Sequence, residues 1–271
     1  MESPAQAAER IRSVKIQGAK EIAIYSLEYL KKFGKEYGFG LKFEVAAMIL
    51  EKARPTAVVL HNCLAILKKR RSLKTINQLI ERLNEATTKI AKQGNKVIPK
   101  NARIMTHCHS GEALAVIREA WKNKKNISVV ATLTEPLHQG IKTVKELSKL
   151  EIPITLITDN AVGYMMKDVD LVMVGSDAIR KNGVANKVGT SLLALAAKQN
   201  KKPFYVVGDM LKLDRRRKFV IEERPASEIY KKIKGVKVRN PAFDITGWKS
   251  ISGVITEKGT LKPEKIQRML G

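Results

Sequence analysis

Two features are missing from this 271-residue chain: a disulfide-forming set of cysteines and a long apolar run. The only cysteines, Cys63 and Cys108, lack CxxC spacing, so we expect both to be reduced. No stretch approaches the roughly 20 apolar residues of a membrane span. The N-terminal residues carry charges where a signal peptide has an apolar core. These absences predict a cytoplasmic protein without a membrane partner.

Acidic and aromatic residues are also scarce. The chain has 51 Lys and Arg against 26 Asp and Glu, a net charge of +25, and only 5% aromatic residues. Such a charge attracts nucleic acids or phosphorylated metabolites, although lysine-rich surfaces can also serve solubility alone. The basic residues are spread out, with short clusters at 68–71 and 215–218, and are not interleaved with aromatic residues. We therefore expect a phosphorylated small molecule rather than a nucleic acid.

The first 98 residues carry helical patterns. Apolar residues recur at three- and four-residue spacing over 7–38, 43–53, 56–73 and 75–97. Gly94 and Pro99 then mark a plausible boundary. We predict a helical N-terminal domain over residues 1–98.

From Ala102 the pattern changes to short apolar runs that alternate with helical segments. The runs cover 102–108, 127–134, 153–159, 171–177 and 203–209, with another at 252–259. Strands without polar alternation, separated by helices, are typical of a parallel sheet covered on both faces. The predicted fold class is therefore α/β: a helical domain followed by a Rossmann-like parallel β-sheet domain, flanked by helices, over residues 99–271.

Ligands of such sheets bind at the carboxyl ends of the strands. Four polar residues fall at predicted strand ends: Cys108, Asp159, Asp177 and Asp209. This shared position predicts a site at that edge of the sheet. For Asp177 the alternative is simpler, since an aspartate after a strand commonly caps the next turn.

Three glycine- or serine-containing segments are candidate anion sites. Ser110 is placed to cap the helix that begins at Gly111, where free N–H groups favour an anion. Asn186 and Lys187 are predicted at another helix start. In the third segment, Gly18 would permit a close approach of the backbone to an anion, with Lys20 beside it. Each segment could instead serve only as a helix cap. Arg54 and Lys212 could likewise be ordinary surface residues.

A metal site would have to use His61, Cys63, His107, Cys108 and His109. On a strand, positions 107 and 109 share one face while Cys108 points to the other, so the three cannot easily converge. We expect no metal and no cofactor.

Several motifs form an ordered set. They are MTHCHS, TEPLHQG, ITDNAVGYMM, VGSDAIRKNGVANKVGT, KPFYVVGDMLKLD and NPAFDITGWKSISGVITEKG, with KIQGAKEIA and ARPTAVVLHNCL in the helical half. This set resembles one superfamily, which contains archaeal ribose-1,5-bisphosphate isomerase, methylthioribose-1-phosphate isomerase and the α, β and δ regulatory subunits of translation initiation factor 2B. THCHS is more similar to the bisphosphate isomerase, because the methylthioribose enzyme usually has Asn after the cysteine.

The resemblance implies an aldose–ketose isomerase for ribose 1,5-bisphosphate. Cys108 would be the catalytic proton carrier and Asp177 its acid partner. The substrate-binding residues would be Gln17, Gly18, Ala19, Arg54, His109, Ser110, Gln139, Asn186, Lys187 and Lys212. The resemblance also implies a homodimer or a larger homo-oligomer.

The two implied catalytic roles need opposite pKa shifts. Asp177 would donate a proton to the ring oxygen, which requires a raised pKa. Cys108 would act as a thiolate, and we expect a helix N-terminus and nearby cations to lower its pKa.

The chain departs from the isomerases at three positions. Gln17 stands where they usually have arginine, Glu135 replaces a second arginine in the segment that begins Thr132-Leu133, and Gly111 replaces a larger residue. Each lost arginine could remove a charge-assisted contact of about 1.5–3 kcal/mol. Residues 159–166 resemble the regulatory subunits. The alternative is thus a non-catalytic regulatory protein that binds a nucleotide or a sugar phosphate.

Overall fold

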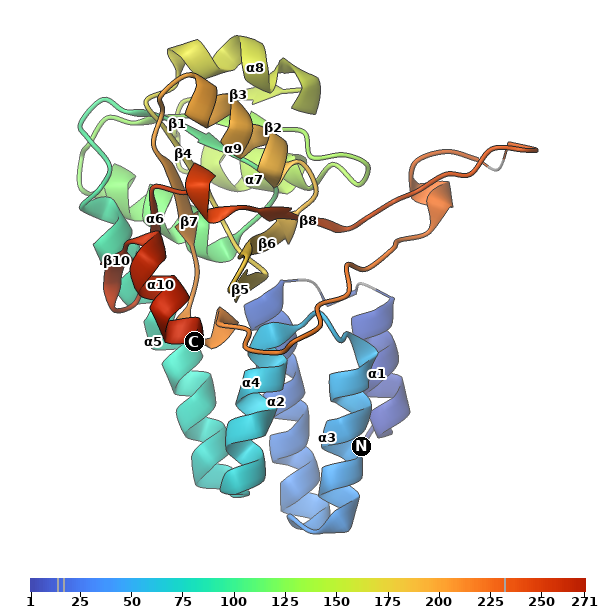
Figure 1. Ribbon diagram of the computed structural model, residues 1–271. Helices are drawn as coiled ribbons and strands as arrows, with labels where there is room; N and C mark the ends of the chain where they lie inside the picture. Colours follow the sequence, from blue (N-terminus) through green and yellow to red (C-terminus); the bar gives the residue numbers. More distant parts are fainter. Residues whose placement is uncertain (14, 17, 232) are drawn as a thin grey trace.

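The computed structural model describes residues 1–13, 15, 16, 18–231 and 233–271. The chain first forms helices and then a seven-stranded sheet (Figure 1). The helices of the N-terminal part are α1 (Pro4–Arg12), α2 (Ala19–Tyr37), α3 (Leu41–Ala53), α4 (Val58–Lys69) and α5 (Leu73–Asn95). The helical pattern expected over 7–38 is interrupted, because Gly18 adopts a φ of +90° immediately before α2.

Helix α5 connects the two parts of the chain. Its Leu79 and Leu83 belong to the core of the helical part, whereas Ile90 packs with residues of the sheet part. Gly94 lies so close to the next helix, α6 (Gly111–Lys122), that a Cβ on it would come within 2.4 Å of Val116. The domain boundary at residue 98 therefore stays a prediction, since α5 packs in both cores.

The large sheet has the strand order β10-β9-β7-β4-β1-β2-β3. Its strands are β1 (Arg103–Thr106), β2 (Ser128–Thr132), β3 (Ile154–Ile157), β4 (Leu171–Val174), β7 (Phe204–Val207), β9 (Gly253–Thr256) and β10 (Gly259–Leu261). Neighbouring strands run parallel except β10, which is antiparallel to β9. The run predicted at 252–259 is thus a strand plus the start of a hairpin, with Gly259 at a φ of +114°.

The strands lack polar alternation because both faces of the sheet are covered. Met105 and Val172 pack in the core that contains α9 (Thr190–Gln199), and Ile104 and Leu171 pack in the core that contains α6. The remaining helices of this part are α7 (Gln139–Ser148), α8 (Val162–Met165) and α10 (Pro263–Leu270). Across the described residues, no helix is both long enough and apolar enough to cross a membrane.

A second, three-stranded antiparallel sheet was not expected. It consists of β5 (Ala178–Arg180), β6 (Gly183–Lys187) and β8 (Phe243–Thr246), in the order β5-β6-β8. The prediction that Asn186 and Lys187 begin a helix is therefore wrong. Both lie on β6, and α9 begins only at Thr190, because Gly189 has a φ of +102° and the carboxylate of Asp244 caps the backbone there.

The described residues of the segment 215–242, here called the arm, connect the 3-10 turn Met210–Lys212 to β8, and the outer part of the arm projects from the body of the molecule (Figure 1). Its longest regular element among the described residues is the 3-10 turn Ala226–Glu228. Antiparallel backbone bonds join the two sides of its base: Arg224 N–H donates to Asn240 O at 2.8 Å, and Ala242 N–H donates to Glu222 O at 2.8 Å.

Candidate active site

A cavity of about 550 Å³ lies at the carboxyl ends of the parallel strands, where the helical part meets the sheet. Of the twelve predicted site residues, Gln17 lies outside the described residues. The other eleven all line this cavity: Gly18, Ala19, Arg54, Cys108, His109, Ser110, Gln139, Asp177, Asn186, Lys187 and Lys212. The structure thus brings together residues from both parts of the chain, while their roles stay predictions.

The cavity is more basic than acidic. Its walls carry seven basic side chains, against four acidic ones. The basic residues are Lys20, Arg54, Arg118, Lys142, Lys187, Lys212 and Arg224; the acidic ones are Glu21, Glu112, Asp177 and Glu228. A cavity of this charge favours a ligand with more than one negative group.

Sequence reasoning missed six of these charged residues: Glu21, Glu112, Arg118, Lys142, Arg224 and Glu228. Arg118 and Lys142 lie on helices α6 and α7, which start at the edge of the sheet, so their positions follow from the fold. Arg224 and Glu228 lie in the arm, where no helical or strand pattern indicates their placement.

Cys108 lies just beyond the end of β1. Its φ of +67° differs from that of a strand residue, so the alternating-face argument used against a metal site does not apply to it. Cys108 N–H donates to Thr134 Oγ1 at 2.9 Å, and Thr143 Oγ1 donates to Cys108 O at 2.8 Å. These two bonds fix the backbone that carries the thiol.

The neighbouring histidines turn away from each other. His107 is buried between Thr132 Oγ1 and Val188 O, whereas the Nδ1 of His109 bonds to Thr143 Oγ1. Burial lowers the pKa of both imidazoles. Within the part of the chain that the structure describes, no three His, Cys, Asp or Glu side chains are grouped so that they could hold a metal ion.

The expected lowering of the Cys108 pKa is wrong. Burial and, after it, the negative charge of Asp177 raise this pKa to about 11, although the His109 N–H, Lys187 and Lys142 act in the opposite direction. Desolvation outweighs the cations because burial disfavours the charged thiolate. The raised pKa favours the neutral thiol over the thiolate.

The side chain of Asp177 is available to a ligand. Among the described residues its carboxyl group accepts no hydrogen bond, so it does not cap the turn that follows β4. Burial raises its pKa, and Lys212 and Arg54 reduce this effect. A carboxyl group of this kind keeps its proton more readily than an exposed aspartate, which a general acid requires.

Lys212 is not an exposed lysine. It ends the 3-10 turn Met210–Lys212 and forms an ion pair with Glu112, in which the side chains are only 5% and 7% exposed. Burial alone lowers the pKa of Lys212, but Glu112 and the nearby Asp177 raise it above its ordinary value. Lys212 thus remains a cation.

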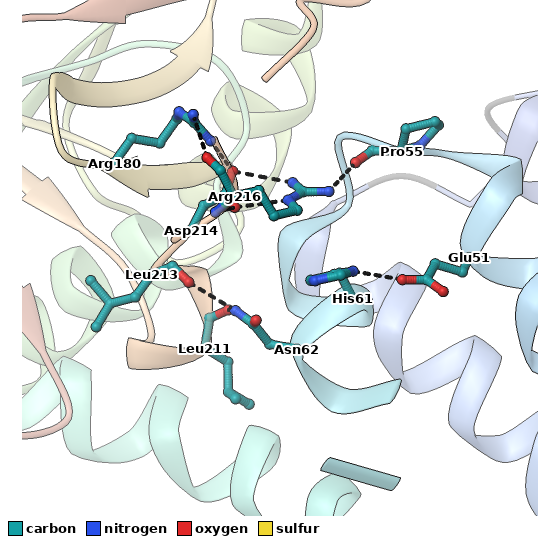
Figure 2. A network of polar contacts seen from close by, with 9 residues as sticks. All are labelled: Glu51, Pro55, His61, Asn62, Arg180, Leu211, Leu213, Asp214 and Arg216. Carbon is teal, nitrogen blue, oxygen red and sulfur yellow. Dashed lines mark hydrogen bonds and ion pairs between the residues drawn. The ribbon is translucent and has the colours of Figure 1, made fainter. Parts of the chain in front are cut away.

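The turn that carries Lys212 is tied to helix α4 (Figure 2). Asn62 Nδ2 donates to the carbonyl oxygens of Leu211 at 2.7 Å and Leu213 at 2.9 Å. The Leu211 side chain also packs in the core of the helical part. The position of Lys212 therefore depends on contacts from both parts of the chain.

A second connection fixes the loop that carries Arg54 (Figure 2). Arg216 Nη1 donates to Pro55 O at 2.8 Å, and its Nε donates to Asp214 Oδ1 at 2.8 Å. Arg180 also pairs with Asp214. Both arginines stabilise the Asp214 carboxylate and lower its pKa despite its burial. His61 bonds to Glu51 beside this network and does not line the cavity that contains Cys108.

The three candidate anion segments differ in the structure. Ser110 caps α6 as predicted, with its Oγ 3.3 Å from Ala113 N. Gly18 is the N-cap residue of α2, and the Glu21 carboxylate lies close to it. On β6, Asn186 Nδ2 donates to Thr190 Oγ1 at 3.0 Å, and burial lowers the pKa of Lys187.

Asp159, Gln139 and Glu135 differ in whether they line the cavity. Asp159 accepts N–H bonds from Thr134 at 2.8 Å and Glu135 at 2.7 Å, so it holds the loop after β2 rather than lining the cavity. The side-chain oxygen Oε1 of Gln139 is buried and accepts no hydrogen bond from the described residues. Glu135 is exposed and pairs with His138, so this replacement for an arginine does not line the cavity.

The comparison with protein families decides the relationship. The model of the initiation factor 2 subunit family matches residues 15–263. The chain belongs to this family. A family member, ribose 1,5-bisphosphate isomerase of Archaeoglobus fulgidus, is 41% identical over 97% of this chain and 91% of its own. Methylthioribose-1-phosphate isomerase of Acetivibrio thermocellus is 37% identical over 95% of this chain and 88% of its own.

Solved structures agree with this family membership. Translation initiation factor eIF-2B of Pyrococcus horikoshii superposes with a TM-score of 0.89 at 28% identity, covering 98% of both chains. The chain is thus similar both to proteins named as isomerases and to a protein named as a translation factor.

Proposed function

We propose that this protein is a sugar-phosphate isomerase that converts ribose 1,5-bisphosphate to ribulose 1,5-bisphosphate. The observation that carries the proposal is that one basic cavity is lined by a thiol, Cys108, and by a carboxyl group of raised pKa, Asp177. The 41% and 37% identity to two ribose 1,5-bisphosphate isomerases supports the same conclusion.

Asp177 acts first in this mechanism. A sugar phosphorylated at C1 cannot open its ring as a free hemiacetal does, so the bond between C1 and the ring oxygen must break while that oxygen gains a proton. Asp177 donates this proton, which its raised pKa allows it to hold. Arg54 and Lys212 stabilise the carboxylate that remains.

Cys108 then moves a proton between carbons. The thiol first gives its proton to solvent. As thiolate it then removes the proton from C2, and the electron pair of that C–H bond forms the C1=C2 double bond of an enol phosphate. The thiol returns its proton to C1 while the C2 hydroxyl loses its proton to Asp177, which gives the ketose and restores both groups. Lys187 and the His109 N–H favour the thiolate that this step needs.

The phosphate groups account for the basic walls. Each phosphate monoester carries about −1.5 to −2 charges at neutral pH. The helical part covers the cavity with Gly18, Ala19 and Arg54, which keeps water from the enol intermediate. Ser110 presents the N-terminus of α6 to an anion.

A homodimer or larger homo-oligomer is part of the proposal. Exposed apolar side chains on neighbouring helices support it: Tyr164 on α8, and Leu192 and Leu195 on α9, are 72%, 60% and 59% exposed. Monomeric proteins rarely leave such side chains grouped and uncovered. Light scattering of the purified protein measures the state directly.

Phosphorus NMR of the purified protein with ribose 1,5-bisphosphate tests the proposed reaction. We expect the ketose bisphosphate to form, and methylthioribose 1-phosphate to react more slowly or not at all. Turnover of methylthioribose 1-phosphate alone would move the substrate assignment to that sugar. Failure of both to react, with binding retained, would favour a non-catalytic, translation-factor-like role.

A further inference from the structure

The base of the arm contributes an arginine to the cavity wall. Arg224 lines the cavity together with Arg54, although the two residues come from opposite ends of the chain. Their side chains are only 19% and 16% exposed. Two largely buried guanidinium groups at one cavity need an explanation, because isolated buried charges are costly.

One carboxylate joins the two arginines. Glu222 Oε2 accepts from Arg54 Nε at 3.2 Å, and Glu222 Oε1 accepts from Arg224 Nη1 at 3.3 Å. Glu228 accepts from the other terminal nitrogen of Arg224 at 2.6 Å. Glu222 itself is absent from the cavity lining. It therefore holds both guanidinium groups from behind.

The backbone around these residues is well anchored. The base of the arm is paired through Arg224 N–H and Asn240 O at 2.8 Å. The buried Asn240 side chain donates to Pro225 O at 3.0 Å and to Glu228 Oε2 at 3.1 Å. The ion pairs thus lie on a fixed support rather than on a free loop.

Both arginines keep unused donors. A guanidinium group has five N–H bonds. Among the described residues, Arg224 uses two of its donors on Glu222 and Glu228, and Arg54 uses one on Glu222. The remaining donors suit the planar, multidentate recognition of a phosphate.

The arm also carries an ion pair of a different kind. Arg239 pairs with Glu223, but the side chains are 65% and 42% exposed and neither residue lines the cavity. This pair needs no ligand to explain it, so it provides a matched control on the same segment.

We propose that Arg224 and Arg54 together bind one phosphate group of the substrate, and that Glu222 is the positioning residue that holds the two guanidinium groups side by side. This proposal rests on the proposed function for the identity of the ligand. Its physical basis is the shared carboxylate, which sets the spacing of the two cations before the substrate enters. Pre-organised charges of this kind bind without a further cost of ordering the side chains.

Calorimetric binding of ribitol 1,5-bisphosphate tests the role of Arg224. This analogue has two phosphates but no carbonyl or anomeric centre, so its binding does not require turnover. We expect Arg224→Gln to weaken binding about 10- to 100-fold, because charge-assisted hydrogen bonds to phosphate are lost. Arg239→Gln should stay within about twofold. Arg224→Gln should lose less affinity for D-ribitol 5-phosphate, because this ligand can place its single phosphate away from Arg224.

Two results would overturn the role of Arg224. One is an Arg224→Gln variant that binds the bisphosphate as tightly as the unaltered protein. The other is an equal loss for the bisphosphate and for D-ribitol 5-phosphate, which would indicate a general disturbance of the cavity. These are binding measurements, so they do not depend on turnover. A protein that binds the analogue but converts no sugar phosphate would refute the proposed isomerase, and the proposed phosphate site at Arg224 and Arg54 would remain supported.

Steady-state kinetics test the role of Glu222. We expect Glu222→Gln to raise KM about 10-fold with kcat within about twofold, since the arginines lose their positions but the reacting groups do not. Glu222→Asp should recover part of the loss. A KM that is unchanged or lower in Glu222→Gln would show that the carboxylate competes with phosphate instead of positioning its ligands. If no turnover is detectable, the dissociation constant of ribitol 1,5-bisphosphate is measured instead. It should rise in Glu222→Gln and rise less in Glu222→Asp.

Discussion

The ionisation of Cys108 can be measured without any knowledge of the substrate. The pKa of this thiol is raised from 9.0 to about 11. At about pH 8, an ordinary thiol would be about one-tenth thiolate, and Cys108 about one-thousandth, a difference of roughly 100-fold. Alkylation by iodoacetamide reports the thiolate, because the thiolate is the nucleophile.

The expected result is a rate that keeps rising with pH. Peptide mass spectrometry should show Cys108 alkylation increasing about tenfold per pH unit between about pH 8 and pH 10, without a plateau. Cys63 is the internal control, because it is fully buried and its pKa is raised to about 12. It should remain unmodified while the protein stays folded.

A variant separates the two main causes of the shift. Burial contributes most to the raised pKa, and the Asp177 carboxylate adds to it. Asp177→Asn should therefore move the alkylation profile to lower pH, whereas Asp168→Asn, at an exposed position that does not line the cavity, should leave it unchanged. A plateau below about pH 9 in the unaltered protein, or no movement in Asp177→Asn, would refute this account of the thiol.

Three further perturbations follow from buried groups. Burial raises the pKa of Asp209 to about 6, so the free energy of unfolding falls as pH rises from about 4 to about 6. Asp209→Asn should remove this slope. At neutral pH it should add about 1–3 kcal/mol to the free energy of unfolding, as measured by urea titration. Lys212→Met leaves Glu112 buried without its cation and should cost about 3–5 kcal/mol, whereas the double variant with Glu112→Gln should recover most of the stability but not the activity. Gly140→Ala places a Cβ 1.8 Å from Thr132 O and should cost about 1–3 kcal/mol in thermal unfolding.

Each of these has a contradicting outcome. An unchanged pH slope in Asp209→Asn would mean that its carboxyl group ionises normally in the native state. If the double variant were as unstable as Lys212→Met, the loss would not come from an unpaired Glu112. For Gly140→Ala the matched control is Gly163→Ala, because a Cβ on Gly163 has nothing within 4 Å. Equal losses in the two alanine variants would contradict the steric explanation.

The position of the site was predictable because each parallel strand is a continuous apolar run. The residue after such a run must lie at the same edge of the sheet, which is why Cys108, Asp159, Asp177 and Asp209 were all placed correctly at strand ends. Their separate tasks were not predictable. Asp159 bonds to a loop and Asp209 caps a turn, and only three-dimensional contacts distinguish these from Asp177.

The three-stranded sheet was missed for a physical reason. Its strands are only three to five residues long, and β6 runs directly into the left-handed Gly189 before α9. The apolar pattern of α9 therefore seemed to extend back over Asn186 and Lys187. The pKa of Cys108 was misjudged because desolvation depends on how closely the helical part covers the thiol. Arg224 could not be found at all, since the arm has no periodicity that would orient its side chains.

The central claim is that Cys108 and Asp177 carry out proton transfer on a bound sugar bisphosphate. The most direct measurement compares turnover of ribose 1,5-bisphosphate in the unaltered protein, Cys108→Ser and Asp177→Asn, with ribitol 1,5-bisphosphate binding measured on all three. The account predicts that kcat falls by at least about 100-fold in each variant while the dissociation constant of the analogue stays within about tenfold. Either variant retaining near-normal turnover would contradict it.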